Sequence, residues 1–238
     1  MRATAALHDA SVTSIAPDGA HALWLTSWMG GFTCMDKRSR LFLHFGRHNF
    51  HRLPNDSIWS LLPLPLGGRC TLAVRGRPIR VSRFLALGHV NRGLTLVDLG
   101  TGRCHNYPIV RCFKARYVAE DGVRTMVADS RGNLWLGTEK GLALFDMKRR
   151  QATEVPGVNG LVCHLALWGD SLCVSTRDMG LVFLSVADYY RHPKRPVLHA
   201  ASLDPTGLSP SLAVTATCAD RSGRLWAGTY ENGLLLYR

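Results

Sequence analysis

Apolar and polar residues alternate in short runs along the whole chain, and Gly, Asp, Asn and Ser separate these runs. Runs such as 12–15, 134–138 and 214–218 are rich in β-branched or aromatic residues. This pattern is typical of short β-strands joined by tight turns. No window of eleven or more residues repeats its apolar positions with the helical spacing i, i+3, i+4 and i+7. The pattern therefore predicts an all-β protein with almost no helix.

Two segments of the chain are near-copies of each other. Residues 129–145 read DSRGNLWLGTEKGLALF, and residues 220–237 read DRSGRLWAGTYENGLLLY. Each contains an acidic turn with glycine, a strand with tryptophan, a Gly-Thr step, a polar turn and a second apolar strand. Weaker copies lie at 18–36, 85–98 and 169–186. Repetition every 40–50 residues or so is typical of propeller blades with four strands each. We therefore expect a β-propeller of about five recognisable four-stranded blades.

We expect a single β-propeller domain over residues 1–238, because all-β domains often exceed the usual length of about 150 residues. Residues 64–83 fit no repeat and are interpreted as an insertion or a decayed blade edge. The repeats are placed at roughly 11–45, 58–107, 123–155, 162–200 and 212–238. They align on the glycine before the second strand of the motif, at Gly31, Gly93, Gly141, Gly180 and Gly233.

The last repeat supplies three strands, and two arrangements would follow. We expect a partial propeller, in which residues 234–237 form an exposed or poorly covered edge. The alternative is a closed ring, in which residues 2–7 pair beside residues 234–237. An uncovered apolar edge strand invites aggregation. We therefore expect residues 234–237 to be covered either by further blades outside this partial propeller or, in the closed ring, by residues 2–7.

The residues that recur in the repeats are predicted to be structural. Trp24, Trp135 and Trp226 occupy equivalent strands, where a large aromatic ring fills the space between neighbouring sheets. Asp129 and Asp220 occupy equivalent turns, where an Asp side chain bonds its own downstream backbone. A catalytic group is used once, so recurrence in several blades favours turn formation over catalysis.

The motif D-x-x-G-x-L-W-x-G-T, followed after two or three residues by G-L-x-x-F/Y, occurs at 129–146 and 220–237 and resembles the two-component regulator propeller repeat. The resemblance is partial at 18–36 and 169–186, and poor between 63 and 88. That repeat builds the extracytoplasmic sensor region of hybrid sensor histidine kinases, best known from gut Bacteroidetes that degrade polysaccharides. The resemblance implies a non-catalytic, ligand-sensing propeller of a two-component receptor, with a periplasmic or extracytoplasmic location and a saccharide ligand. Family sensors carry more blades, and the kinase would lie outside this chain.

The chain is basic, with 29 Lys and Arg against 17 Asp and Glu and a formal net charge of +12. Such a charge favours polyanionic partners, including acidic glycans, nucleic acids and membrane surfaces. The tightest clusters, 148–150 and 191–195, are short and accompany no nucleic-acid motif, so no specific nucleic-acid partner is expected. No apolar stretch reaches 18 residues, which predicts no membrane span in this chain. Residues 1–10 lack the apolar core of a signal peptide, so the extracytoplasmic location rests on the resemblance.

The seven cysteines are predicted to be mostly free. Their number is odd and no C-x-x-C pair occurs. Several fall in predicted strands, where cysteine behaves as a small hydrophobe. Free thiols fit poorly with the oxidising compartment that the resemblance implies.

No catalytic or metal-binding motif is present. His44, His48 and His51 lie close together, but no Cys or carboxylate accompanies them at the spacing of zinc ligands. Their segment is interpreted as an inter-blade loop, with stacking on a sugar or base as the alternative. The sequence has no G-x-S-x-G, H-E-x-x-H or phosphate-binding loop motif. We therefore expect no metal, no cofactor and no enzymatic activity, and a propeller glycosidase or lyase is the least favoured alternative.

In a propeller, the loops between blades and the turns between second and third strands share one face. Aromatic, Arg and Asn side chains on that face suit an oligosaccharide, especially an acidic glycan. The same side chains dominate protein interfaces, so a scaffold that binds a protein partner, or a dimer of propellers, is the alternative function. The predicted ligand-binding residues are Trp28, His48, Phe50, Arg92, Tyr117, Lys140, Arg177 and Tyr230.

Overall fold

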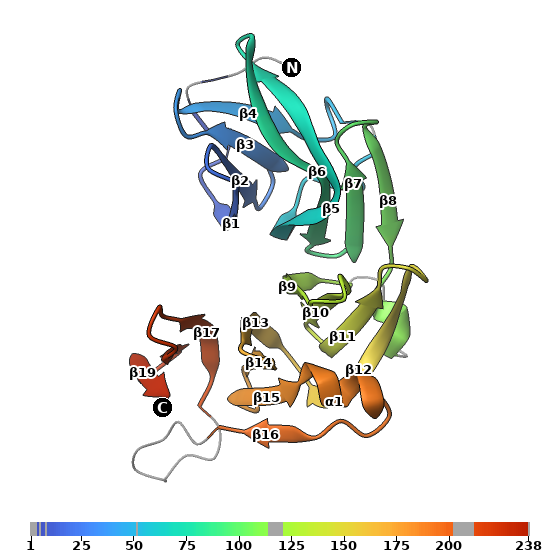
Figure 1. Cartoon of the computed structure of the whole chain (residues 1–238), viewed down its shortest axis with the longest axis vertical. Coiled ribbons are helices and arrows are strands. Elements are labelled where there is room, and N and C mark those ends of the chain that lie inside the picture. The colour runs from blue at the N-terminus through green and yellow to red at the C-terminus, as the bar shows by residue number, and fades with distance from the viewer. Residues whose placement is uncertain are drawn as a thin grey trace. The chain divides into compact units, whose positions relative to one another are not determined.

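The computed structural model describes residues 4, 6–7, 9–50, 52–113, 121–201 and 212–237. The described strands form five antiparallel sheets, four with four strands and one with three, each strand next to its neighbour in the chain (Figure 1). This arrangement confirms the predicted all-β fold with about five blades. The chain divides into two units, which are described separately below.

Unit 1 comprises residues 1–109 and 117–123 and contains blades 1 and 2. The strands of blade 1 are β1 (Val12–Asp18), β2 (Ala22–Ser27), β3 (Phe32–Asp36) and β4 (Leu41–Phe45). The strands of blade 2 are β5 (Ile58–Val74), β6 (Arg77–His89), β7 (Leu94–Asp98) and β8 (Arg103–Tyr107).

Unit 2 comprises residues 110–116 and 124–238 and contains blades 3 to 5. Blade 3 has β9 (Val123–Ala128), β10 (Leu134–Thr138), β11 (Gly141–Asp146) and β12 (Gln151–Asn159). Blade 4 has β13 (Val162–Trp168), β14 (Ser171–Thr176), β15 (Leu181–Ser185) and β16 (Leu198–Ala200). Blade 5 has β17 (Val214–Ala219), β18 (Leu225–Thr229) and β19 (Leu234–Tyr237). A short 3-10 helix, η1 (Val110–Phe113), and one helical turn and a half, α1 (Val186–Arg191), complete the unit.

Four of the five glycines that align the repeats share a left-handed backbone conformation, whereas Gly141 of blade 3 has φ of 147°. Gly31 follows β2 with φ of 74°, and its carbonyl accepts a hydrogen bond from the Ser27 N–H. A Cβ atom on Gly31 would lie 2.2 Å from the carbonyl oxygen of Phe45, so no larger residue fits. The glycines at the equivalent turns of blades 2, 4 and 5 have φ between 68° and 69°: Gly93, Gly180 and Gly233.

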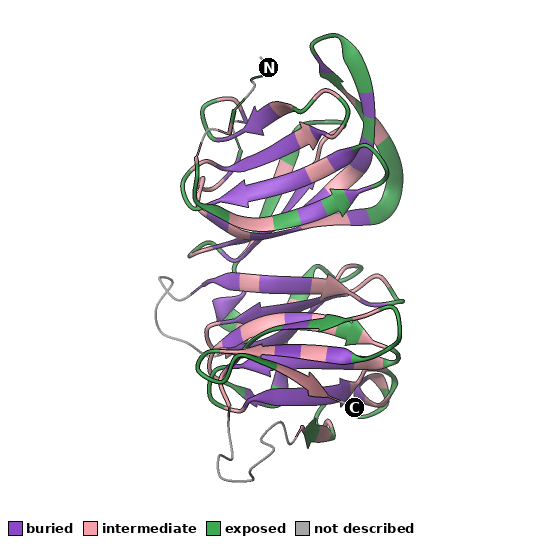
Figure 2. Ribbon diagram, turned by 90° about the vertical axis from the view of Figure 1, so that its left-hand side faces the viewer, coloured by how far each residue is buried: buried purple, intermediate pink, exposed green. Residues whose placement is uncertain are grey.

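The repeated tryptophans differ in burial. Trp24 and Trp135 are fully buried, as expected of residues that fill the space between sheets, and Figure 2 shows buried strands at the centre of each unit. Trp24 packs against Phe32 and Phe45, whose rings stack with centroids 4.8 Å apart. Trp226 is only half-buried, so the third copy of the motif lacks the cover that the other two have.

Residues 64–83 are an insertion that lengthens blade 2. After Leu64 pairs with Phe84, the register shifts, and pairing resumes from Arg69 opposite Ser82 to the tip of the hairpin. Gly67 lies in this break with φ of 73°. The hairpin extension therefore belongs to β5 and β6 and projects beyond the repeat (Figure 1).

The N-terminal segment pairs with blade 1. Thr4 exchanges two backbone hydrogen bonds with Phe42 of β4, at 3.0 and 2.9 Å. Residues 2, 3 and 5 lie outside the described residues. Thr4 therefore pairs with β4, and not with residues 234–237 as the closed-ring alternative requires.

Candidate functional site

The turns between second and third strands meet the inter-blade loops within each unit, as the sequence predicts. In unit 1, the Gly31 N–H donates to the Asp56 carbonyl and the Val90 N–H donates to that of Ser57. Unit 2 has the same kind of contact: the Gly160 N–H donates to the carbonyl of Lys140 at 3.2 Å. Each unit therefore carries a continuous loop surface at this end of its sheets.

Unit 1 has a hollow of about 320 Å³ on this surface. The side chains of Trp28 and Met29, on the turn between β2 and β3, are 45% and 72% exposed. Such large apolar groups are usually buried, so their exposure here marks a surface suited to contact with another molecule. The lining residues are Asp9, Ser11, Trp28, Met29 and Gly30.

A second tryptophan adjoins the hollow. The ring of Trp59 lies with its centroid 6.0 Å from that of Trp28, at an interplanar angle of 52°. Trp59 sits where the β5–β6 register shifts between Ile58 and Ser60, and such bulges re-aim side chains. A Cβ atom on Gly122 would lie 2.5 Å from the Trp59 ring, so the backbone there packs closely on the indole. Trp59 was not among the predicted ligand-binding residues, because the sequence gives no sign of the bulge that brings it beside Trp28.

The carboxylate of Asp9 holds the turn beside the hollow. It accepts the backbone N–H groups of Ser11 at 2.9 Å and Met29 at 3.0 Å. These hydrogen bonds lower the pKa of Asp9, so the group stays negatively charged at neutral pH. The hollow therefore combines aromatic faces with a fixed anionic acceptor.

A buried histidine supports the neighbouring loop. His89 replaces the threonine of the Gly-Thr step, and burial lowers its pKa to about 4. Its Nδ1 donates to the amide oxygen of Asn55 at 2.6 Å, and Asn55 in turn donates to the side chain of Asn91 at 2.8 Å. This chain of neutral hydrogen bonds fixes the two amides at the loop surface.

The equivalent end of unit 2 is charged. Arg124 and Glu139 form an ion pair at 3.6 Å. Burial raises the pKa of the Cys163 thiol, while the charges of Arg124 and Arg177 oppose that shift. The predicted residue Lys140 is half-buried on this surface and Arg177 is exposed.

The remaining predicted residues fall into different environments. Phe50 is 8% exposed and packs edge-on against Phe32 and Phe45, so its expected role as a stacking surface is corrected to a core role. The sequence placed it in a loop, but the loop folds the ring inward. Tyr117 lies outside the described residues. The exposed members of the predicted set are Trp28, His48, Arg92, Arg177 and Tyr230.

The histidine segment forms no metal site among the described residues. His44 is buried; its Nδ1 is 2.9 Å from the Thr33 hydroxyl and its Nε2 is 3.1 Å from the Ala6 carbonyl. His44 therefore ties the N-terminal segment to blade 1. His51 lies outside the described residues.

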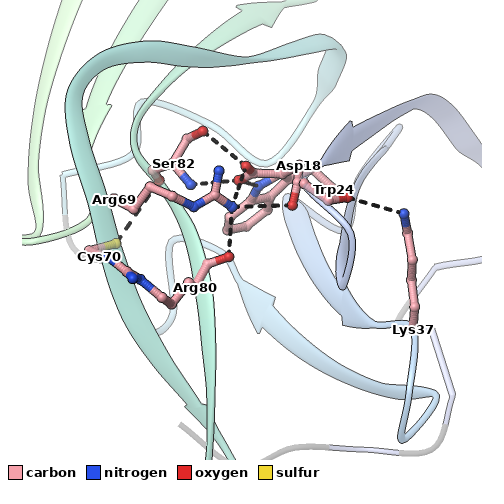
Figure 3. A network of polar contacts seen from close by, with 8 residues as sticks. Asp18, Trp24, Lys37, Arg69, Cys70, Arg80 and Ser82 are labelled. Carbon is pink, nitrogen blue, oxygen red and sulfur yellow. Dashed lines mark hydrogen bonds and ion pairs between the residues drawn. The ribbon is translucent and has the colours of Figure 1, made fainter.

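A recurring turn links an aspartate to the tryptophan six positions later. The carboxylate accepts the indole N–H in three blades: Trp24 to Asp18 at 2.9 Å, Trp135 to Asp129 at 3.1 Å, and Trp226 to Asp220 at 3.1 Å. Each aspartate also takes a further donor. Ser82 and Arg69 reach Asp18 from the hairpin extension (Figure 3), and the Tyr190 hydroxyl reaches Asp129 at 2.6 Å. These contacts confirm a structural role for the repeated aspartates.

A second hollow, of about 240 Å³, lies beside one of these turns in unit 2. Arg131 lies over the ring of Tyr190 at 3.8 Å from its centroid, and both residues line the hollow. Both carboxylate oxygens of Asp129 already accept hydrogen bonds from the protein. This acidic group in the wall of the hollow is therefore occupied by contacts within the turn.

All seven cysteines are free, as expected. No helix in the described part of the chain is long and apolar enough to cross a membrane.

The family model for the two component regulator propeller matches residues 118–140 and 207–231. This match confirms the predicted resemblance at both segments. Among curated proteins, none matches the sequence significantly.

Solved structures share the fold. The extracellular domain of the hybrid two component system BT3049 from B. thetaiotaomicron aligns with a TM-score of 0.72 and 20% identity, over 94% of this chain and 26% of its own. The extracellular domain of the hybrid two component system BT4673 from the same organism aligns with a TM-score of 0.66 and 22% identity, over 96% and 27%. The computationally designed Ika8 protein aligns with a TM-score of 0.59 and 10% identity, over 97% and 59%. The chain thus spans about a quarter of the length of the two receptor domains.

Proposed function

We propose that this chain is part of an extracytoplasmic sensor domain of a two-component receptor, and that unit 1 binds a saccharide at the Trp28–Trp59 hollow. The family match and the fold shared with extracellular receptor domains support the sensor assignment. The kinase that would transmit the signal lies outside this chain, and the propeller itself binds without catalysis.

The exposed Trp28 and the half-buried Trp59 beside it carry the saccharide assignment. An indole face packs against the apolar C–H face of a sugar ring, and nearby polar groups accept and donate hydrogen bonds to its hydroxyls. Trp28 offers such a face, Asp9 offers a charged acceptor, and Asn91 offers an exposed amide. The hollow of about 320 Å³ is within the range of small-ligand sites, about 300–1,000 Å³.

Calorimetry on oligosaccharides selected by a glycan array tests the proposal. Trp28→Ala is expected to weaken binding at least about tenfold, because loss of a central tryptophan contact costs about 2 kcal/mol. Asp9→Asn is expected to weaken it less, since it keeps one amide oxygen as an acceptor and leaves Trp28 in place, although only one of the two backbone donors keeps its partner. Val197→Ala, which trims an exposed apolar residue in unit 2, is the matched control and should leave affinity unchanged.

Failure of the folded protein to bind any neutral or acidic oligosaccharide would contradict the saccharide assignment. Equal affinity for the wild type and Trp28→Ala would place the site elsewhere. A protein partner that is lost on Trp28→Ala would instead favour the scaffold, since exposed Trp and Met also form interface hot spots.

A further inference from the structure

The hairpin extension has an unusual composition. Residues 64–83 contain no Lys, Asp, Glu or aromatic residue. The arginine guanidinium presents a planar fork that binds carboxylate, sulfate or phosphate groups with two parallel hydrogen bonds. The extension contains five such groups: Arg69, Arg75, Arg77, Arg80 and Arg83.

The extension is fixed on blade 1. Its inward residues Val74, Ile79 and Val81 are buried in the same core cluster as Trp24. Asp18, only 4% exposed, accepts the Ser82 N–H at 2.7 Å and the Ser82 hydroxyl at 2.9 Å (Figure 3). Any ligand on the outer side therefore meets a surface that needs little ordering on binding.

Two of the five arginines are used internally. Arg69 pairs with Asp18 at 3.1 Å. Arg83 binds both carboxylate oxygens of Asp98 at 2.9 Å, which lowers the pKa of Asp98 to about 2. The carboxylates of Asp18 and Asp98 are therefore already paired with these two arginines.

The other three arginines are exposed at or near the tip of the hairpin: Arg75 in the turn, Arg77 opposite Val74, and Arg80 on the other face of the ribbon from Ile79. Arg75, Arg77 and Arg80 are exposed, and none pairs with an acid in the described part of the chain. Arg40, on the turn between β3 and β4, is also exposed. Nearby, the Lys37 ammonium bonds the Gly19 carbonyl at 3.4 Å, and Gly19 lies against Arg69. The face of unit 1 around the hairpin is therefore uniformly positive.

We propose that Arg75, Arg77 and Arg80 form a binding surface for an acidic polysaccharide, one that carries carboxylate or sulfate groups. This surface is distinct from the tryptophan hollow. The turn from β5 to β6 lies at the opposite end of the sheets from the turn between β2 and β3 that carries Trp28. A projecting ribbon suits an extended chain with repeated charges, since its exposed arginines are spread along it.

The surface is less suited to other polyanions. Single-stranded nucleic acid is bound by cations interleaved with aromatic rings, and residues 64–83 contain no aromatic residue. A membrane-surface segment exposes large apolar side chains beside its cations, whereas Val74 and Ile79 beside the tip arginines are buried and the exposed Leu66 lies near the base of the extension.

The test compares two triple variants in binding to heparin and to polygalacturonate at fixed salt. R75Q/R77Q/R80Q should lose binding by at least about tenfold, because it removes the outward arginines. K148Q/R149Q/R150Q is the matched control and should stay within about twofold of wild type. Each set removes three charges, and each includes one residue with positive φ, Arg75 at 48° or Arg150 at 57°, so the backbone strain is similar. Thermal unfolding checks that both variants fold.

Each other outcome would overturn the proposal. Equal losses in the two variants would mean that the net charge of +12 acts as a whole. Unchanged binding in R75Q/R77Q/R80Q would exclude the hairpin. Tighter binding to phosphatidylglycerol vesicles or to single-stranded DNA would identify another partner. Loss of heparin or polygalacturonate binding in Trp28→Ala would place the acidic polysaccharide at the tryptophan hollow instead of the hairpin. This result does not depend on whether the hollow also binds a smaller saccharide.

Discussion

The two near-identical repeats in unit 2 have the same local structure but different surroundings. In both, an aspartate accepts the indole N–H of the tryptophan six positions later, at 3.1 Å. In blade 3, α1 covers the turn: Tyr189 packs edge-on against Trp135, and Tyr190 donates its hydroxyl to Asp129. In blade 5 the turn supplies its own partner, since Arg224 pairs with Asp220 at 2.7 Å. The motif thus specifies the turn, and residues outside the motif determine how far its tryptophan is buried.

The largest expected effect separates the two tryptophans. Trp135→Ala should lower the free energy of unfolding by about 3–5 kcal/mol, because it removes a fully buried ring and leaves a cavity. Trp226→Ala should cost about half as much, because its ring is half-buried. Urea unfolding of both variants measures the difference. Equal costs would mean that the cover over blade 3 adds nothing to the burial of its tryptophan.

A smaller effect is expected from the cover itself. Tyr190→Phe should destabilise the protein by about 1–3 kcal/mol, because Asp129 loses a hydrogen bond of 2.6 Å in a partly buried site. Burial and the hydrogen bond to Asp129 raise the pKa of Tyr190, and the hydrogen bond from Asn133 opposes that shift. Tyr237→Phe is the control, because its hydroxyl makes no hydrogen bond within the described residues. A Tyr190→Phe variant as stable as that control would contradict the role of the hydroxyl.

The smallest effect concerns the titration of Asp220. The indole N–H of Trp226 and the Arg224 guanidinium lower the pKa of Asp220 to about 2. A carboxyl whose pKa is depressed on folding stabilises the fold above its unfolded pKa, about 3.9, and loses that contribution as pH falls through about 2. The NMR signal of the Trp226 indole N–H should therefore shift with a midpoint near pH 2. Arg224→Gln should raise this midpoint, and a midpoint near pH 4 in the wild type would contradict the predicted pairing.

The fold was predictable because its determinants are local and repeated. Gly31, Gly93 and Gly141 lie where a Cβ atom would approach a backbone carbonyl oxygen to within 2.2–2.3 Å, and a glycine recurs at this position in each copy. The helix α1 was not predicted, because its six residues are too few to show a helical spacing of apolar positions. In the structure, the Ser185 hydroxyl accepts the Asp188 N–H and caps the start of this helix.

The candidate site was less predictable because it depends on contacts between distant segments. Trp28 was identified from its turn, whereas Trp59 joins it only through the bulge in β5. Phe50 has the composition of a surface loop around it, and only the packing of Phe32 and Phe45 reveals that it turns inward. Residues 64–83 matched no repeat, and only the structure shows that Ile79 and Val81 pack into the core of unit 1.

The two covered aspartates have a consequence for how the chain is synthesised. Ser82 follows Asp18 by 64 residues, and Tyr190 follows Asp129 by 61. Each carboxylate therefore leaves the ribosome before the blade that completes its hydrogen bonds. Blades 1 and 3 emerge with polar groups still facing water, and each can bury them only once its successor has been translated. The nascent protein should accordingly gain protection from proteases in steps of two blades rather than one.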